Sequence, residues 1–244
     1  MTTTRTTTDT VTRPPTTGTS AGHPQRWSIL AVVCLAVFVT TLDGLIVNIA
    51  LPRLALDLGA ATRELQWIVD AYLLVFTGLL LAAGALGDRY GRKKILVAGL
   101  AVFGVTSAYA GSVGSAGELI SARALMGIGA AAIFPATLAI ITDVFSVPSE
   151  RAKAIGVWSA VSGIGVAAGP VVGGWLLEHF WWGSVFYINI PVVIVAIVAT
   201  VLLVPESRDE TTPRLDIVGL LLSIATISTL VVTIIEAPVH GWTD

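Results

Sequence analysis

The chain has 244 residues, of which 55% are hydrophobic and only 12% are charged, and its mean hydropathy is +0.84. A soluble domain carries about 25% charged residues, so this composition excludes a water-facing globular surface and indicates lipid as the surrounding solvent. Cations confined to short loops exclude a nucleic-acid-binding patch, and the single cysteine, Cys34, excludes a disulfide within the chain.

The first 26 residues differ in composition from the rest of the chain. Eleven of the first 20 are threonine, with Pro14 and Pro15 among them. Such a segment has too little apolar surface to fold, so residues 1–26 are expected to form a disordered Thr-rich cytoplasmic tail. The apolar run that follows is about 25 residues long and lacks a small-residue cleavage site, which favours a membrane span over a signal peptide.

Seven apolar stretches are long enough to cross a bilayer core, which needs roughly 20 residues per helix. Backbone polar groups cannot stay unpaired in hydrocarbon, so each stretch is predicted to be a helix and the fold class to be an all-α integral membrane protein. The stretches are residues 27–51, 66–86, 95–114, 119–141, 154–177, 184–204 and 217–236.

The lysines and arginines outside these spans are distributed unequally. Eleven fall in the N-terminal tail and in the loops after the second, fourth and sixth spans, whereas the opposite side has only Arg53 and Arg63. Loops on the cytoplasmic side of membrane proteins are enriched in such cations. This bias predicts a multi-pass plasma-membrane protein with its N-terminus in the cytoplasm and residue 244 outside.

Two charged residues fall inside predicted spans, Asp43 in the first and Arg123 early in the fourth. A charge at membrane depth costs a few kcal/mol, so such residues usually face a wet cavity or a partner. We expect Asp43 to be a carboxylate that takes up and releases protons, and Arg123 to tune it or to bind substrate. A structural pair, or side chains that reach the interface, are the alternatives, and the sequence leaves contact between the two residues open.

The most distinctive stretch lies between the second and third spans. It reads Gly-x-x-Gly-Asp-Arg-x-Gly-Arg-Lys-Lys over residues 84–94. The glycines permit a tight turn, and Asp88 can pair with an arginine or with a helix N-terminus. A basic cytoplasmic loop accounts for the cations but not for this spacing, so we expect a gating loop. Its candidate residues are Gly84, Gly87, Asp88, Arg89, Gly91, Arg92 and Lys93.

The fifth span is rich in glycine. Gly165, Gly169 and Gly173 are four residues apart and share one helix face, which lets another helix approach closely. Pro170 removes a backbone hydrogen bond and is expected to kink the helix. Generic packing needs the glycines but not the Gly-Pro pair, so we expect a hinge or a tight helix contact. The candidate residues are Gly163, Gly165, Gly169, Pro170, Gly173 and Gly174.

Together these motifs resemble the major facilitator superfamily, most closely its fourteen-span drug/proton antiporter branch. The resemblance runs from the first span to the end of the chain. Its signatures fall on residues 42–52, 84–94, 123–130, 163–174, 182–191 and 215–219. Two places differ from the family pattern: Leu45 stands where threonine is common, and residues 181–184 read Trp-Trp-Gly-Ser where a Trp-Arg-Trp run is usual.

The resemblance implies a six-helix bundle over residues 27–204, built of two inverted three-helix repeats whose first and fourth spans line the cavity. It also implies a cytoplasmic linker over 205–216, a seventh span over 217–236 and a truncated outer tail over 237–244. The implied function is proton-coupled export of drugs or other small amphipathic molecules, driven by the proton gradient without a cofactor or metal. Family members have a second six-helix half, so we expect a partial chain that needs this C-terminal half or a second copy.

Other functions stay open. A nutrient or metabolite facilitator would share the fold, although the Gly-Pro content of the fifth span favours an exporter. A non-transporting membrane subunit would bind a partner transporter instead. A membrane enzyme is disfavoured, because His23, His179 and His240 all lie outside the predicted spans.

Overall fold

The computed structural model describes residues 23–208 and the single positions 219, 222, 225, 226, 229, 230 and 233, all seven of them helical. The predicted tail up to residue 22, most of the linker and seventh span, and the outer tail lie outside the described residues. The described part is all-helical. Its elements are α1 (Arg26–Asp57), α2 (Thr62–Tyr90), α3 (Arg92–Ala110), α4 (Ala116–Val144), α5 (Pro148–His179), α6 (Ser184–Tyr187) and α7 (Asn189–Leu203).

Six spans within this part of the chain are long and apolar enough to cross a membrane. The short helix α6 and helix α7 together make the sixth, over Ser184–Leu203. These six coincide with the first six predicted spans, and the predicted all-α membrane fold is confirmed. Helices α1, α2, α4 and α5 run past the predicted ends, because a helix keeps its backbone groups paired as it leaves the hydrocarbon for the headgroup layer.

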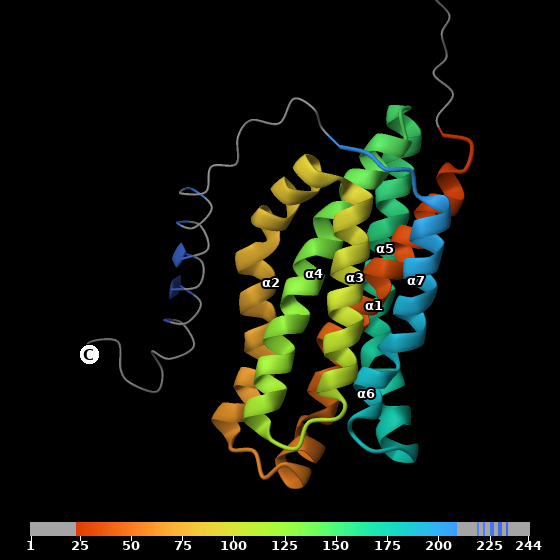
Figure 1. The fold of residues 1–244 in the computed structure, drawn as a ribbon. Coiled ribbons are helices and arrows are strands. Elements are labelled where there is room, and N and C mark those ends of the chain that lie inside the picture. Colours follow the sequence, from red (N-terminus) through yellow and green to blue (C-terminus); the bar gives the residue numbers. More distant parts are fainter. Residues whose placement is uncertain are drawn as a thin grey trace, which may run out of the picture.

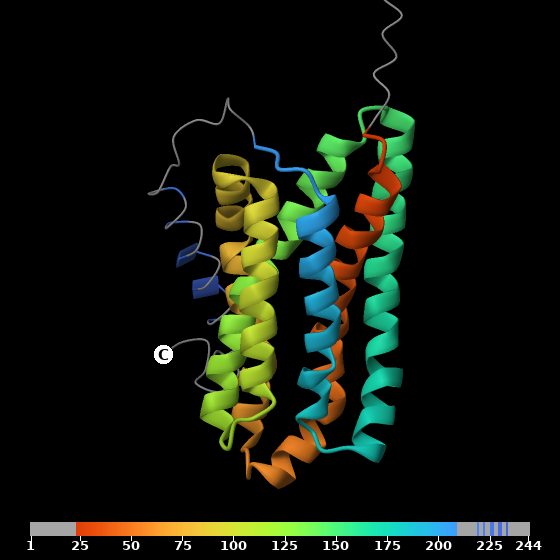
Figure 2. The same ribbon diagram turned by 45° about the vertical axis from the view of Figure 1, so that its right-hand side comes forward.

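The long helices stand side by side in one bundle, with successive helices running in opposite directions (Figure 1). Helix α4 packs against α2 and α3, while α1 packs against α5 and α7, and α1 and α4 contact each other. Figure 2 shows the two groups from a second side. Helices α1 and α4 are the most buried of the six spans, so any charge on them is held inside the bundle.

The turn between α2 and α3 is shorter than the sequence predicted. Helix α2 continues to Tyr90 and α3 begins at Arg92, so the expectation that Gly84 and Gly87 shape a loop was wrong: both lie within α2. Glycine remains helical here because unpaired backbone groups are too costly near lipid. Gly91 alone turns the chain, with a φ of +113° that side chains rarely adopt.

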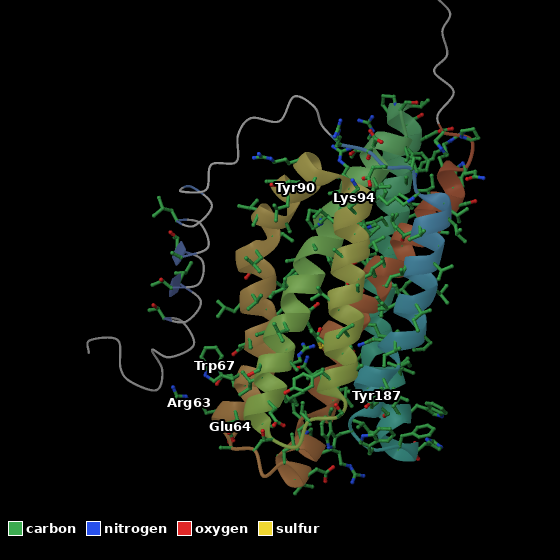
Figure 3. All side chains as sticks on the ribbon, viewed as in Figure 1. Arg63, Glu64, Trp67, Tyr90, Lys94 and Tyr187 are labelled. Atoms are coloured by element: carbon green, nitrogen blue, oxygen red, sulfur yellow. The ribbon has the colours of Figure 1, made fainter. Side chains whose placement is uncertain are left out.

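The segments with most cations gather at one end of the bundle. Residues 204–208 cross the α2–α3 turn, where the backbone N–H of Arg92 donates to the carbonyl of Ser207 over 2.9 Å. Arg26 at the start of α1 pairs there with Glu150 at the start of α5, at 2.9 Å. Figure 3 places the labelled residues Tyr90 and Lys94 at this end, and Arg63, Glu64, Trp67 and Tyr187 at the other.

The backbone conformation of Gly91 in the α2–α3 turn leads to a prediction about stability. Gly91→Ala is expected to destabilise the protein by about 1–3 kcal/mol, the usual cost of a residue held in a sparsely populated backbone region. The added Cβ would also meet the carboxylate of Glu206. The melting temperature of the purified protein in detergent measures the effect. Gly87→Ala is the matched control, since a Cβ there meets nothing within 4 Å; equal melting temperatures for the two variants would contradict the role of Gly91.

Candidate functional site

Asp43 and Arg123 meet across the contact between α1 and α4. Nη1 of Arg123 lies 2.5 Å from Oδ2 of Asp43, and both side chains have 0% of their surface exposed. The structure therefore joins the two residues that the sequence places at membrane depth. The contact supports a pair enclosed by the bundle, while the depth of this pair in the membrane stays a prediction. Removing one partner of such a pair leaves an uncompensated buried charge, at a cost of about 3–5 kcal/mol.

Helix α2 holds the guanidinium of Arg123 in place. Its Nε donates to the carbonyl of Ile68 over 3.1 Å, and its central carbon lies 4.3 Å from the centre of the Tyr72 ring. The Tyr72 hydroxyl donates in turn to the carbonyl of Thr40 over 3.3 Å. A planar guanidinium over an aromatic face gains electrostatic attraction and a fixed orientation. Nη2 of Arg123 has no hydrogen-bond partner among the described residues.

The second carboxylate oxygen of Asp43 accepts a hydrogen bond from a residue of α7. Nδ2 of Asn189 donates to Oδ1 of Asp43 over 2.8 Å and to Oγ of Ser107, on α3, over 3.0 Å. The Ser107 hydroxyl donates to the carbonyl of Phe186 over 2.9 Å. Tyr72, Ser107 and Asn189 were not predicted from the sequence as site residues. An amide at the edge of an otherwise apolar span was the available signal, because a buried amide needs hydrogen-bond partners.

An apolar cavity of about 220 Å³ lies beside the ion pair, between α1, α2, α4 and α5. Aromatic rings form a row along it. The Tyr72 and Phe76 rings are stacked with centres 6.2 Å apart, and Phe76 meets Phe134 edge to face at 5.2 Å. Phe134 meets Trp158 in the same way at 5.7 Å. Tyr72 therefore contacts both the guanidinium of Arg123 and the cavity, so one side chain links the charged pair to the apolar wall.

The Gly84–Lys94 motif lies at the end of the bundle and does not contact Asp43. Asp88 pairs with Arg92, one helical turn later, with both Nε and Nη2 of Arg92 at 3.0 Å from Oδ1 of Asp88. Arg92 also reaches α4, where its Nη1 lies 3.6 Å from Oδ1 of Asp143. Lys93 donates to the carbonyl of Val201 on α7 over 2.9 Å, and the Arg89 guanidinium lies over the Tyr90 ring at 5.5 Å. The motif thus ties α2, α3, α4 and α7 together at one end.

The glycine stripe of α5 packs directly on α1. A Cβ added to Gly169 would lie 3.1 Å from the Cβ of Leu45, and one added to Gly173 would lie 2.8 Å from Cγ1 of Ile46. A Cβ on Gly165 would collide with the Thr41 hydroxyl.

The other candidates on α5 do not make this contact. A Cβ on Gly163 or Gly174 would meet nothing within 4 Å, and Pro170 lies inside a helix that continues to His179. The stripe therefore supports α1 in the region of Asp43, while a hinge at Pro170 stays a prediction. The part of the chain that the structure describes holds no group of three or more His, Cys, Asp or Glu residues suited to a metal ion.

The chain matches one family model and also curated proteins that are named for resistance or for transport. The Major Facilitator Superfamily model matches residues 33–239. The chain is 42% identical over 221 residues to the puromycin resistance protein pur8 of Streptomyces alboniger, covering 91% of this chain and 44% of the relative. It is 44% identical over 189 residues to the methyl viologen resistance protein SmvA of Salmonella typhimurium, covering 76% and 38%. It is 40% identical over 199 residues to the riboflavin transporter RibZ of Clostridioides difficile, covering 81% and 43%.

A solved structure shares the fold. The proton:xylose symporter XylE superposes with a TM-score of 0.66 at 17% identity, covering 88% of this chain and 54% of that one. At this identity the similarity concerns the fold alone. The chain spans less than half the length of each of these three curated relatives.

The buried pair predicts non-additive effects on stability. Arg123→Met is expected to destabilise the protein by about 3–5 kcal/mol because it leaves the Asp43 carboxylate without its partner. Adding Asp43→Leu should recover most of this loss, since apolar residues replace both charges. Melting temperatures of the single and double variants in detergent form the double-mutant cycle. Additive effects of the two substitutions would show that the residues do not act as a pair.

Proposed function

The chain belongs to the major facilitator superfamily, and from this premise we propose that it is one bundle of a proton-coupled exporter of small amphipathic molecules. It is a multi-pass membrane protein with six described spans. The observation that carries the proposal is the Asp43–Arg123 pair, buried beside an apolar cavity. Resistance to puromycin and to methyl viologen, the functions that give two relatives their names, supports export as the direction.

The ion pair supplies a physical basis for coupling to protons. Attraction between opposite charges is strong where water is excluded, so the ionised Asp43 holds Arg123 and with it the α1–α4 contact. A proton entering from outside neutralises the carboxylate and removes that attraction. The guanidinium keeps its contacts with Ile68 and Tyr72 on α2. Loading therefore loosens α1 from α4 and favours release of substrate outside, and loss of the proton to the cytoplasm resets the pair.

The aromatic row supports the proposed substrate class. Aromatic faces attract flat apolar molecules and organic cations. Tyr72, Phe76 and Phe134 all line the cavity beside the ion pair. Puromycin has aromatic rings and an aliphatic amino group, methyl viologen is a flat dication, and both suit such a wall. The energy source in this proposal is the proton gradient, and no cofactor takes part.

Transport in this proposal needs a second bundle. Alternating access works by the rocking of one bundle against another around a site near the membrane midplane. The chain matches 38–44% of the length of its curated relatives. A C-terminal half or a second copy of the chain would complete the site. The N-terminus is proposed to be cytoplasmic, on the side of the eleven cations.

A nutrient transporter is the second candidate function. It is favoured by the 40% identity to RibZ, whose name gives riboflavin as its substrate. The aromatic wall also suits the flat riboflavin ring system. The direction of transport separates the two functions, because an exporter lowers the cellular content of its substrate and an importer raises it.

Efflux assays test the proposed function. The protein encoded by the complete gene is expressed in an efflux-deficient bacterial host, and accumulation of puromycin, methyl viologen and riboflavin is measured with and without a protonophore. Asp43→Asn is expected to reduce proton-driven export by about tenfold or more, within the range of typical coupling free energies of 1–3 kcal/mol. Asp57→Asn, at an exposed acid near the end of α1, is the control and should export normally. Unchanged proton-driven export in Asp43→Asn at normal expression would contradict the assignment of Asp43 as the proton-exchanging residue.

Cysteine labelling tests the proposed orientation. Arg63→Cys and Lys94→Cys, made in a variant without native cysteines, lie at opposite ends of the bundle (Figure 3). With a cytoplasmic N-terminus, Arg63→Cys reacts with a membrane-impermeant maleimide on intact cells and Lys94→Cys reacts only after permeabilisation. The reverse pattern of labelling would overturn the orientation.

A further inference from the structure

Asn189 connects the ion pair to the junction between α6 and α7. It is the first residue of α7, and it is buried with 0% exposure. Its Nδ2 donates to Oδ1 of Asp43 and to Oγ of Ser107, which itself donates to the carbonyl of Phe186 on α6. A continuous path of hydrogen bonds therefore runs from α1 through α7 and α3 to α6.

The two ends of the Asn189 amide are in different situations. The nitrogen has two acceptors, whereas Oδ1 is buried without a hydrogen-bond partner among the residues the structure describes. An ionised carboxylate can only accept, so Asp43 requires the nitrogen end of the amide. Ser107 gives its proton to Phe186 and therefore also accepts from Asn189. This orientation leaves the amide oxygen unpaired, which is unfavourable in a buried site.

Protonation of Asp43 reverses these requirements. A proton on Oδ1 makes that oxygen a donor, which no longer pairs with the amide N–H. A half-turn of the amide about its last side-chain torsion, which has a broad two-fold preference, brings Oδ1 of Asn189 to the carboxyl instead. The amide oxygen then accepts from Asp43 and from Ser107, whose hydroxyl turns away from Phe186. The previously unpaired oxygen gains two donors, whereas the two amide N–H groups lose their acceptors and the Phe186 carbonyl loses its donor. The network therefore has three hydrogen bonds with ionised Asp43 and two after protonation, so on balance it favours the ionised form.

We propose that Asn189 is a positioning residue that reads the protonation state of Asp43 and, through Ser107, passes it to the α6–α7 junction. The proposal rests on the proposed function in one respect, namely that Asp43 exchanges protons.

Among the residues that the structure describes, the charged and titratable groups around Asp43 are Arg123 from α4 and Tyr72 from α2. Helices α3 and α7 contribute the neutral Ser107 and Asn189, and α5 contributes glycines. The guanidinium only donates, so among these contacts the amide is the group whose two ends can be exchanged.

Infrared difference spectroscopy of the purified protein in lipid nanodiscs tests the inference. The band of the protonated Asp43 carboxyl, assigned by its loss in Asp43→Asn, is followed as a function of pH. Asn189→Leu removes a hydrogen bond that favours the ionised form, so the midpoint should move to higher pH by about one unit. Ser107→Ala, which removes the support of the amide, should move it in the same direction by less. In the wild type, an Asn189 amide carbonyl band should shift with the same midpoint.

Thr200→Val is the matched control, because Thr200 is a buried polar residue on the same helix whose hydroxyl has no hydrogen-bond partner in the described part. Its midpoint should stay at the wild-type value. An unchanged midpoint in Asn189→Leu, an equal shift in Thr200→Val, or a carboxyl band that does not change with pH overturns the inference. Ser107→Ala carries the test if Asn189→Leu does not fold.

The titration requires no transport. A midpoint shift without proton-driven export of puromycin, methyl viologen or riboflavin would therefore reject the proposed function and keep the inference. Export that depends on Asp43, together with an unchanged midpoint in Asn189→Leu, would keep the proposed function and reject the inference.

Discussion

The structure depends on a pair of opposite charges that has no contact with water. Moving each ion from water into a medium of low dielectric constant costs several kcal/mol, and the pair is tolerated only if the remaining polar atoms are also paired. The surrounding helices meet most of this requirement. Helix α2 supplies the Ile68 carbonyl and the Tyr72 ring to Arg123, and α7 supplies Asn189 to Asp43. One interaction thereby helps to fix the relative positions of these helices, and in the proposed function it is also the interaction that a proton removes.

Helix α1 is held on its other side by close packing rather than by charge. Association of helices in lipid gains little from the hydrophobic effect, so contact depends on how near the backbones come. Gly165, Gly169 and Gly173 let α5 lie directly on the stretch of α1 that contains Asp43. In the proposed mechanism, a shift of α1 after the pair is neutralised would be transmitted directly to α5, because no side chain of the three glycines separates the two helices. In the proposed mechanism, α1 is therefore the helix expected to move.

Local features of the sequence predicted the spans and the unusual depth of Asp43 and Arg123, because length, hydropathy and a misplaced charge are all visible in one segment. Contact between these two residues is not local, since 80 positions separate them in the chain. Asn189 and Tyr72 are ordinary residue types whose role arises only from packing. The prediction that Gly84 and Gly87 belong to a loop was wrong, because glycine favours turns in water and stays helical where backbone hydrogen bonds are costly to lose. On α5, the glycines that repeat every four residues are the ones that pack on α1. Gly163 and Gly174 lie outside this repeat, and a Cβ added to either would meet nothing within 4 Å.

The open side of the cavity can be identified from one polar residue. Lipid can cover an exposed valine or leucine, so the low burial of α5 does not by itself distinguish a lipid face from a protein interface. Asn48 does distinguish them: it lies on α1, is exposed, and lines the cavity beside the ion pair. An exposed amide at membrane depth is costly against hydrocarbon and favourable against water or another protein surface. We infer that the face of α1 carrying Asn48 is turned away from lipid, toward the substrate path and the second bundle. In the proposed function, the charged pair would lie directly behind the wall that the substrate touches, and this short separation would let protonation and substrate binding influence each other.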